Sequence, residues 1–199
     1  LLRLVGMKRI VVHGGGWGID ALLQKMGMET QRYRGHRITD ARTLTVVEMA
    51  LSELNQELTS LINRHGGRAV GVDGQDGRFI HACPMEVTSA DPDAPDLGFL
   101  GDVESIDTGY IDLLLSRDFV PVIMPIGVAT DGTTYHINSD LLAGRLARAL
   151  GADEVKGIRV VRQGFHRPPS GRLGVRPGLL GQRSVVHAVF QPVGFPGLA

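Results

Sequence analysis

Apolar and polar residues follow two different periods along most of the chain, and these periods predict strands and helices. Short β-branched or apolar runs predict strands over residues 8–12, 69–72, 79–82 and 119–126. Apolar residues spaced three or four apart predict helices over residues 19–28, 44–62, 107–117 and 140–150. The first strand, the glycines that follow it and the first helix together form half of a βαβ unit.

The clearest predicted element is a long amphipathic helix in the first third of the chain. Its apolar stripe consists of Leu44, Val47, Leu51, Leu54, Leu58, Leu61 and Ile62. Thr39 or Asp40 can cap its N-terminus, and the glycines at 66–67 end it. Ser139 is expected to cap the last predicted helix.

After Val155 the pattern changes, and no regular element is predicted with clarity. Short apolar pieces at 158–161 and 184–190 are interrupted by eight glycines and five prolines in residues 156–199. No stretch in this part sustains a helical period. The sequence therefore divides into residues 1–155 and an atypical Gly- and Pro-rich tail, residues 156–199.

The charge distribution changes at the same point. The chain has 21 Lys and Arg against 21 Asp and Glu, but all 21 acidic residues precede Lys156. With 14 basic residues, 1–155 carries a net charge of −7, and 156–199, with 7 basic residues, carries +7. Such asymmetry is typical of a nucleic-acid-binding tail or of segments of different origin. The tail has no recognisable nucleic-acid module, which disfavours the first reading. An altered reading frame, or another non-native terminus, also accounts for its composition.

Composition limits the class of protein. A hydrophobic content of 43% and a charged content of 21% favour a globular protein. Cys83 is the single cysteine, so an internal disulfide is excluded. The longest apolar stretch, 119–129, is too short to span a bilayer, and no cationic leader is recognised; we therefore expect a cytoplasmic protein without a membrane partner. No metal site is expected, because ligand spacing is absent among His13, His36, His65, His81 and His136.

Three segments could carry chemistry. The glycines at 14–16 lie between a strand and a helix, where backbone N–H groups can bind an anion, although such a turn also occurs without a ligand. Arg37 could bind a carboxylate through its planar fork, or it could be a solvated residue near a helix start. Asn138 and Asp140 precede or begin a helix and could either cap it or line a site.

Taken together, these segments resemble the acetylglutamate kinases of the amino-acid kinase family. Residues 10–16 (IVVHGGG) are similar to the family's first glycine loop, and residues 35–40 (GHRITD) resemble its substrate-arginine segment. Residues 135–140 (YHINSD) resemble its Asn-x-Asn-Ala-Asp segment. The similarity spans residues 8 to 155 and includes 46–49, 55–73, 98–106 and 121–128.

The resemblance implies a three-layer α/β/α sandwich on a mostly parallel sheet. It implies phosphorylation of the γ-carboxylate of N-acetyl-L-glutamate by ATP, with Mg²⁺, in arginine biosynthesis. It also implies a homodimer or a larger homo-oligomer. The substrate would contact the residues Gly14, Gly15, Gly16, Arg37, His136 and Asn138. Asp140 would be catalytic, because it would organise the family's lysines.

Three departures from the family qualify this expectation. His136 stands where the family usually has asparagine, which leaves the identity of the substrate open. The family's first strand, with its Lys-x-Gly-Gly, and its nucleotide-binding half are not recognised, as in a kinase truncated at both ends. Of the lysines present, Lys8, Lys25 and Lys156, none is placed to clamp a phosphoryl group. We therefore predict poor turnover for this chain alone.

Two other functions remain open from the sequence. The chain could be a kinase relative that acts on another acidic amino-acid derivative, as His136 indicates. It could also be a catalytically inactive protein that binds a small acidic metabolite or pairs with kinase subunits, as the missing lysines indicate.

Overall fold

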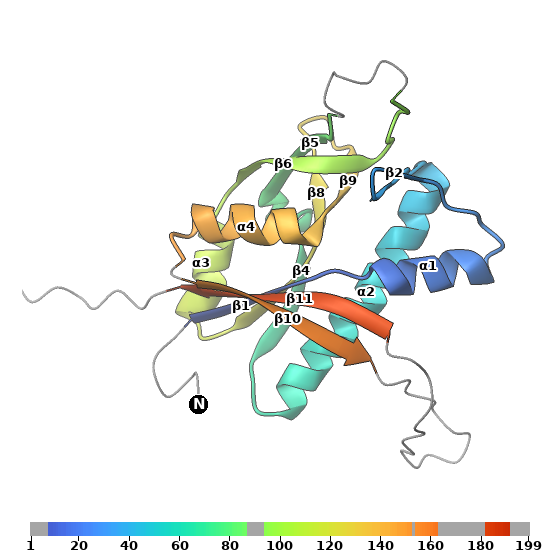
Figure 1. The fold of residues 1–199 in the computed structure, drawn as a ribbon. Helices are drawn as coiled ribbons and strands as arrows, with labels where there is room; N and C mark the ends of the chain where they lie inside the picture. Colours follow the sequence, from blue (N-terminus) through green and yellow to red (C-terminus); the bar gives the residue numbers. More distant parts are fainter. Residues whose placement is uncertain (1–7, 87–93, 153, 163–181, 192–199) are drawn as a thin grey trace, which may run out of the picture.

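The structure, a computed structural model, describes residues 8–86, 94–152, 154–162 and 182–191. Its first elements are β1 (Lys8–His13), α1 (Gly16–Lys25), β2 (Arg32–Tyr33), β3 (His36–Arg37), α2 (Ala41–Arg64), β4 (Ala69–Asp73), a 3₁₀ turn (Asp76–Arg78), β5 (Ile80–Pro84) and β6 (Leu100–Ile106). They are followed by α3 (Gly109–Ser116), β7 (Val120–Met124), β8 (Ile126–Val128), β9 (Thr134–Ile137), α4 (Ser139–Ala149), β10 (Glu154–Arg162) and β11 (Gln182–Gln191). Figure 1 shows their arrangement.

The main sheet has the strand order β10-β11-β1-β7-β4. β7 pairs in parallel with both β1 and β4, and these three strands carry the apolar runs predicted from the sequence. β11 pairs antiparallel with β1 and with β10. The structure is thus a mixed α/β fold with a parallel core.

Alternate residues of the central strands face different helices. Ile10, Val12 and Ile123 pack in one cluster with side chains of α3 and α4. Val11 and Val122 pack in another with side chains of α2. Since successive side chains of a strand point to opposite faces, this alternation buries the central strands on both sides.

Four further strands form a second sheet that closes on itself, β5-β6-β9-β8. The predicted strand over 119–126 is divided by Pro125 into β7 and β8, which belong to different sheets. Proline has no backbone N–H to donate to a ladder, but its carbonyl oxygen accepts a hydrogen bond from the Ile137 N–H at 2.9 Å. The chain can therefore leave one sheet and enter the other at this residue.

The helix predictions are largely confirmed, with changes at the ends. The Asp40 carboxylate caps α2 by accepting a hydrogen bond from the Thr43 N–H at 2.7 Å, and this bond lowers the pKa of Asp40. Asn138, rather than Ser139, caps α4. The apolar stripe of α2 is buried toward its N-terminal half, whereas Leu61 is 45% exposed.

The C-terminal part contains two strands, β10 and β11, where the sequence pattern predicted no clear element. The apolar pieces at 158–161 and 184–190 lie within them. β10 pairs with β11, and β11 pairs with β1. These contacts join residues far apart in the sequence, and a local period does not reveal them. Residues 163–181 and 192–199 of the tail lie outside the described residues, and the division of the chain at Val155 stays a prediction.

Candidate functional site

The glycine turn joins the end of β1 to the start of α1. Gly15 is the N-cap of α1, and no side chain caps this helix. A Cβ on Gly15 would lie 2.9 Å from a methyl carbon of Leu51 on α2. The backbone at Gly15 therefore packs closely against α2, and glycine permits this approach. A Cβ on Gly16 would meet nothing within 4 Å. The first N–H groups of α1 are therefore free of a side-chain cap, as in helix ends that bind anions.

Arg37 is buried, with 4% of its side chain exposed. One terminal nitrogen, Nη2, donates a hydrogen bond to Asp20 Oδ1 at 2.7 Å. The other, Nη1, is buried and has no partner. This arrangement contradicts the alternative of a solvated arginine, and it leaves a charged donor available to a ligand.

Asp20 lies on α1 and also binds Arg32, whose Nη2 donates to Asp20 Oδ2 at 3.1 Å. Neither Asp20 nor Arg32 was singled out from the sequence. An acidic residue on an amphipathic helix has the pattern of a solvated face, and the sequence does not reveal the contacts of Asp20 with Arg32 and the buried Arg37.

His136 lies on β9 and is half-buried. Burial, and to a lesser extent the nearby Arg37 cation, together lower the pKa of His136 to about 4. Its imidazole is therefore neutral at physiological pH. Its Nδ1 atom is buried without a hydrogen-bond partner, so this ring also presents an unsatisfied polar atom.

The segment before α4 caps this helix and also lines a cavity. Asn138 Oδ1 accepts hydrogen bonds from the backbone N–H groups of Asp140 at 2.8 Å and Leu141 at 3.3 Å. The capping interpretation is thus confirmed for Asn138. The side chains of Asn138 and Asp140 are both exposed.

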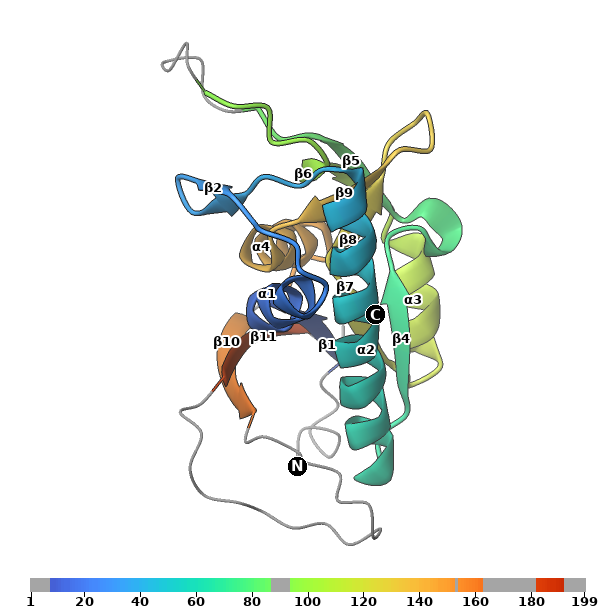
Figure 2. The same cartoon turned by 90° about the vertical axis from the view of Figure 1, so that its right-hand side faces the viewer.

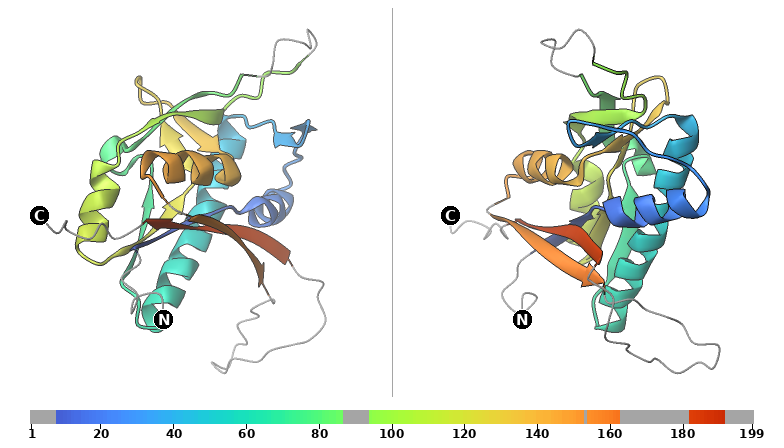
Figure 3. Two further views of the ribbon diagram at one scale, coloured as in Figure 1. Left: turned by 60° about the vertical axis from the view of Figure 1, so that its left-hand side comes forward. Right: turned by 45° about the vertical axis from the view of Figure 1, so that its right-hand side comes forward.

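All seven residues singled out from the sequence line one cavity of about 280 Å³. Its lining consists of Gly14, Gly15, Gly16, Ile19, Arg32, Gly35, His36, Arg37, Leu100, Pro125, His136, Asn138, Ser139 and Asp140. They come from α1, the β2–β3 hairpin, the second sheet and the start of α4, which lie on the same side of the molecule (Figures 2 and 3). We call this the arginine cavity.

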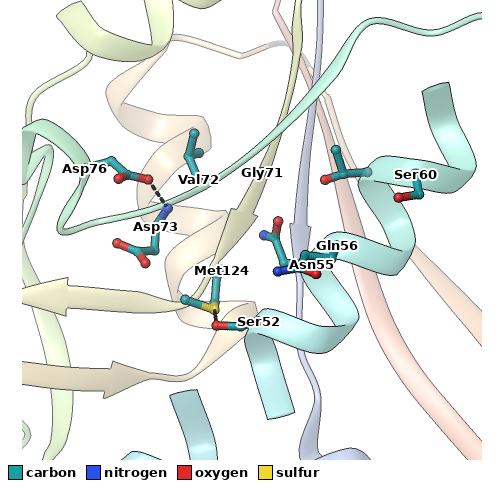
Figure 4. Close-up of a pocket in the computed structure, with 10 residues that line it drawn as sticks. Ser52, Asn55, Gln56, Ser60, Gly71, Val72, Asp73, Asp76 and Met124 are labelled. Carbon is teal, nitrogen blue, oxygen red and sulfur yellow. Dashed lines mark hydrogen bonds between the residues drawn. The ribbon is translucent and has the colours of Figure 1, made fainter. Parts of the chain in front are cut away.

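A second cavity, of about 380 Å³, lies between α2 and the end of β4 (Figure 4). Its lining consists of Ser52, Asn55, Gln56, Thr59, Ser60, Gly71, Val72, Asp73, Asp76 and Met124, so both of its charged side chains are acidic. Burial raises the pKa of Asp73, and the Asp76 carboxylate raises it too. We call this the acidic cavity.

Two buried residues, Asn55 and His13, contact each other. Asn55, which lines the acidic cavity, donates through Nδ2 to the Val122 carbonyl oxygen at 2.8 Å and lies 3.2 Å from His13 Nε2. His13 immediately precedes the glycine turn, and burial lowers its pKa to about 4. A neutral ring can accept the Asn55 amide proton at Nε2.

A parallel α/β core in which a glycine turn leads into an uncapped helix start beside a buried arginine is an arrangement common among α/β proteins that bind anions. Residues 1–157 match the sequence profile of the Amino acid kinase family. The chain belongs to this family.

Two curated relatives are both named acetylglutamate kinase. The protein from Chromobacterium violaceum is 49% identical over 156 residues, which cover 78% of this chain and 54% of the relative. The protein from Nitrosococcus oceani is 47% identical over 164 residues, with the same coverage of 78% and 54%. The chain thus spans about half the length of the curated relatives it matches.

Among solved structures, smu.665 from Streptococcus mutans superposes with a TM-score of 0.62 at 26% identity, covering 70% of this chain and 55% of that one. An N-acetylglutamate synthase from Neisseria gonorrhoeae shares the fold at a TM-score of 0.55 and 20% identity, covering 71% of this chain and 30% of that one. Within the described residues, no helix is both long and apolar enough to cross a membrane.

Proposed function

We propose that the arginine cavity binds N-acetyl-L-glutamate, and that the chain contributes to phosphorylation of the γ-carboxylate of this substrate by ATP. The observation that carries the proposal is the pair of buried, unpartnered nitrogens, Arg37 Nη1 and His136 Nδ1, in one cavity. Leaving buried polar groups unsatisfied costs about 1–3 kcal/mol each, so their presence together favours a polar ligand. The names of the curated relatives supply the identity of that ligand.

Each element of the cavity has a part in this proposal. The N–H groups at Gly14, Gly15 and Gly16 bind oxygen atoms of the substrate, as helix starts bind anions elsewhere. Arg37 binds one carboxylate through Nη1, and neutral His136 contributes a hydrogen bond.

Asn138 holds the start of α4 in place beside the cavity. Asp140, on the first turn of α4, orients the cationic groups that a phosphoryl transfer requires. In phosphoryl transfer the protein mainly positions the two reactants and balances charge, and these residues contribute by positioning the reactants.

ATP is the expected phosphoryl donor, because the family is one of kinases. Mg²⁺ would arrive with the nucleotide phosphates. Within residues 8–86, 94–152, 154–162 and 182–191, no group of three His, Cys, Asp or Glu side chains could hold a metal ion. We also propose that the fold is that of a three-layer α/β/α sandwich, and that the chain assembles as a homodimer or a larger homo-oligomer.

His136 favours a second candidate function, because acetylglutamate kinases usually have asparagine at the corresponding position. An imidazole differs from an amide in shape and in its response to pH, so the preferred ligand could be another acidic amino-acid derivative. A third candidate is binding without turnover. Neither Lys8 at the start of β1 nor Lys25 at the end of α1 lines the arginine cavity, which supports it.

Calorimetric titration of the full chain with N-acetyl-L-glutamate tests the proposal. N-acetyl-L-glutamine, which lacks the γ-carboxylate, serves as the matched control ligand, and N-acetyl-L-aspartate tests the second candidate. We expect binding of the glutamate derivative and weak binding of the glutamine derivative. An assay of ADP release in parallel separates binding from turnover. Preference for N-acetyl-L-aspartate would establish the second candidate, and absence of binding by all three would contradict the proposal.

A further inference from the structure

Asp20 is an acidic residue at the edge of a cavity whose expected ligand is an anion. It lies on α1, one helical turn after Gly16. Its Oδ1 accepts a hydrogen bond from Arg37 Nη2 at 2.7 Å, and its Oδ2 accepts one from Arg32 Nη2 at 3.1 Å. The negative charge of Asp20 would repel an anionic ligand if the two arginines that it binds did not balance it.

We propose that Asp20 is a positioning residue: by holding Nη2 of Arg37, it directs Nη1 toward the carboxylate of the ligand. This inference rests on the proposed function, because it takes the ligand to be an acidic amino-acid derivative. Asp20 touches Arg37 and not the ligand.

The first support is the burial of the guanidinium. Arg37 is 4% exposed, whereas Asp20 is 46% exposed. A buried cation requires a counter-charge and hydrogen bonds, and Asp20 supplies both while it remains partly hydrated. The pair therefore holds a charge in the cavity wall at a smaller desolvation cost than two buried ions would require.

The second support is the shape of the guanidinium. Its terminal nitrogens lie in one rigid plane, so fixing Nη2 fixes the direction of Nη1. Nη2 is bound to Asp20 at 2.7 Å, and Nη1 is buried without a partner in a residue that lines the cavity. One nitrogen is held by the protein, and the other is left for the ligand.

The third support is the element that carries Asp20. α1 also begins with the glycine turn, whose N–H groups are the other proposed ligand contacts. The contact between Asp20 and Arg37 joins α1 to β3. It thereby fixes the distance between the two parts of the cavity that must meet one ligand, and preorganisation of this kind strengthens binding.

The test compares the affinity of the full chain for N-acetyl-L-glutamate between wild type and Asp20→Asn. We expect Asp20→Asn to weaken binding about tenfold, the value of one charge-assisted hydrogen bond. Asp20→Glu keeps the carboxylate and should recover most of the loss. Asp112→Asn, the same change on α3 away from the cavity, serves as the control and should leave the affinity unchanged.

A double-mutant cycle shows whether Asp20 acts through Arg37. In the Arg37→Ala background, Asp20→Asn should have no further effect on affinity. An additive loss in the double variant would overturn the inference. So would tighter binding by Asp20→Asn alone, because it would show that Asp20 merely repels the ligand.

A measurement without ligand keeps the inference testable if the proposed function fails. In wild type, the terminal N–H protons of Arg37 should give separate NMR signals, because the contact with Asp20 slows rotation of the guanidinium. In Asp20→Asn these signals should merge. If they stay separate, Asp20 does not fix the guanidinium and the inference is wrong, whereas failure of the wild type to bind ligand contradicts only the proposed function.

Discussion

The arginine cavity and the acidic cavity lie at neighbouring strand ends of one protein, yet their chemistry is opposite. The two cavities are comparable in size, about 380 Å³ for the acidic cavity and about 280 Å³ for the arginine cavity. The charged lining residues of the acidic cavity are Asp73 and Asp76, whereas those of the arginine cavity are Arg32, Arg37 and Asp140. Size therefore does not identify the ligand site here. The signs of the charges and the unsatisfied donors do, because an anion is attracted to one cavity and repelled by the other.

The two cavities also differ in how their polar groups are satisfied. In the acidic cavity, Asp73 Oδ1 accepts a hydrogen bond from the Gln75 N–H at 2.8 Å, and Asp76 Oδ2 accepts one from the Asp73 N–H at 3.0 Å. These carboxylates are occupied by their own loop. Thr59, which lines the acidic cavity, also has a buried hydroxyl without a partner, but that group is neutral. In the arginine cavity, a nitrogen of the charged Arg37 and one of His136 are left without partners. An anionic ligand can therefore gain more in the arginine cavity.

The largest expected effect comes from removing the cation of the arginine cavity. Arg37→Ala should weaken binding of N-acetyl-L-glutamate about 100-fold, since charge-assisted hydrogen bonds contribute about 1.5–3 kcal/mol each. Titration calorimetry measures the loss. Arg37→Lys keeps the charge but not the planar fork and should recover part of it. Gln56→Ala, in the acidic cavity, is the control, and an equal loss there would remove the distinction between the cavities.

A smaller effect is expected at His13, the buried residue that ends β1. Burial lowers its pKa from 6.5 to about 4, so the unfolded chain binds more protons than the folded one between these pH values. Stability should therefore fall as the pH drops through this window, by about 2 kcal/mol from pH 7 to pH 5.

Urea unfolding of wild type and His13→Gln at these two pH values measures this contribution. Glutamine can still accept the hydrogen bond from Asn55, but it does not titrate, so His13→Gln should lose less stability on acidification. His65→Gln, at an exposed histidine that ends α2, should behave as wild type. Equal acid sensitivity in all three proteins would show that His13 is not held neutral.

The elements that were predicted from the sequence carry either a continuous apolar run or a helical stripe of apolar residues. β1, β4 and β7 are apolar runs in the sheet, and α2 has a long stripe that a period of 3.6 reveals. β6 was not predicted, because Asp102 and Glu104 interrupt its apolar pattern. β9 has only four residues, Thr134–Ile137, too few to show a period. Both owe their structure to pairing in the second sheet.

In the candidate site, too, segments with a recognisable sequence pattern were predicted, and features that depend on contacts between distant residues were missed. The glycine turn and the start of α4 have the local signals of a turn and a cap, and the resemblance of residues 10–16, 35–40 and 135–140 to family motifs assigned them and Arg37 to a site. Asp20 was missed, since its importance lies in a contact with a residue 17 positions away. The neutral state of His136 was missed too, because burial and the nearby Arg37, rather than neighbouring residues in the sequence, lower its pKa.

We expect ligand binding to depend on pH because of His136, which lines the arginine cavity and not the acidic cavity. A carboxylate bound at Nδ1 favours the charged ring and raises the pKa of His136 above its value of about 4 in the empty cavity. Binding should then take up protons and strengthen as the pH falls, by about threefold from pH 7.5 to pH 5.5.

Calorimetry in two buffers with different enthalpies of ionisation measures this proton uptake. His136→Asn carries the residue expected from the resemblance and cannot titrate, so its uptake should vanish. His36→Gln, at another histidine that lines the cavity, is the matched control and should leave the uptake unchanged. If His36→Gln rather than His136→Asn abolishes it, the assignment of the titrating group is wrong.

The smallest effect is expected in the acidic cavity. Asp76→Asn removes one of two like charges but keeps an oxygen that can accept the hydrogen bond from the Asp73 N–H. Because Asp76 is exposed, the gain in the free energy of unfolding at pH 7 should be only about 0.3 kcal/mol. The gain should shrink in high salt, which screens the repulsion between the two carboxylates. Urea unfolding measures it, and calorimetry should find the affinity for N-acetyl-L-glutamate unchanged. A change in that affinity beyond twofold would show that the two cavities are coupled, which their separate linings do not predict.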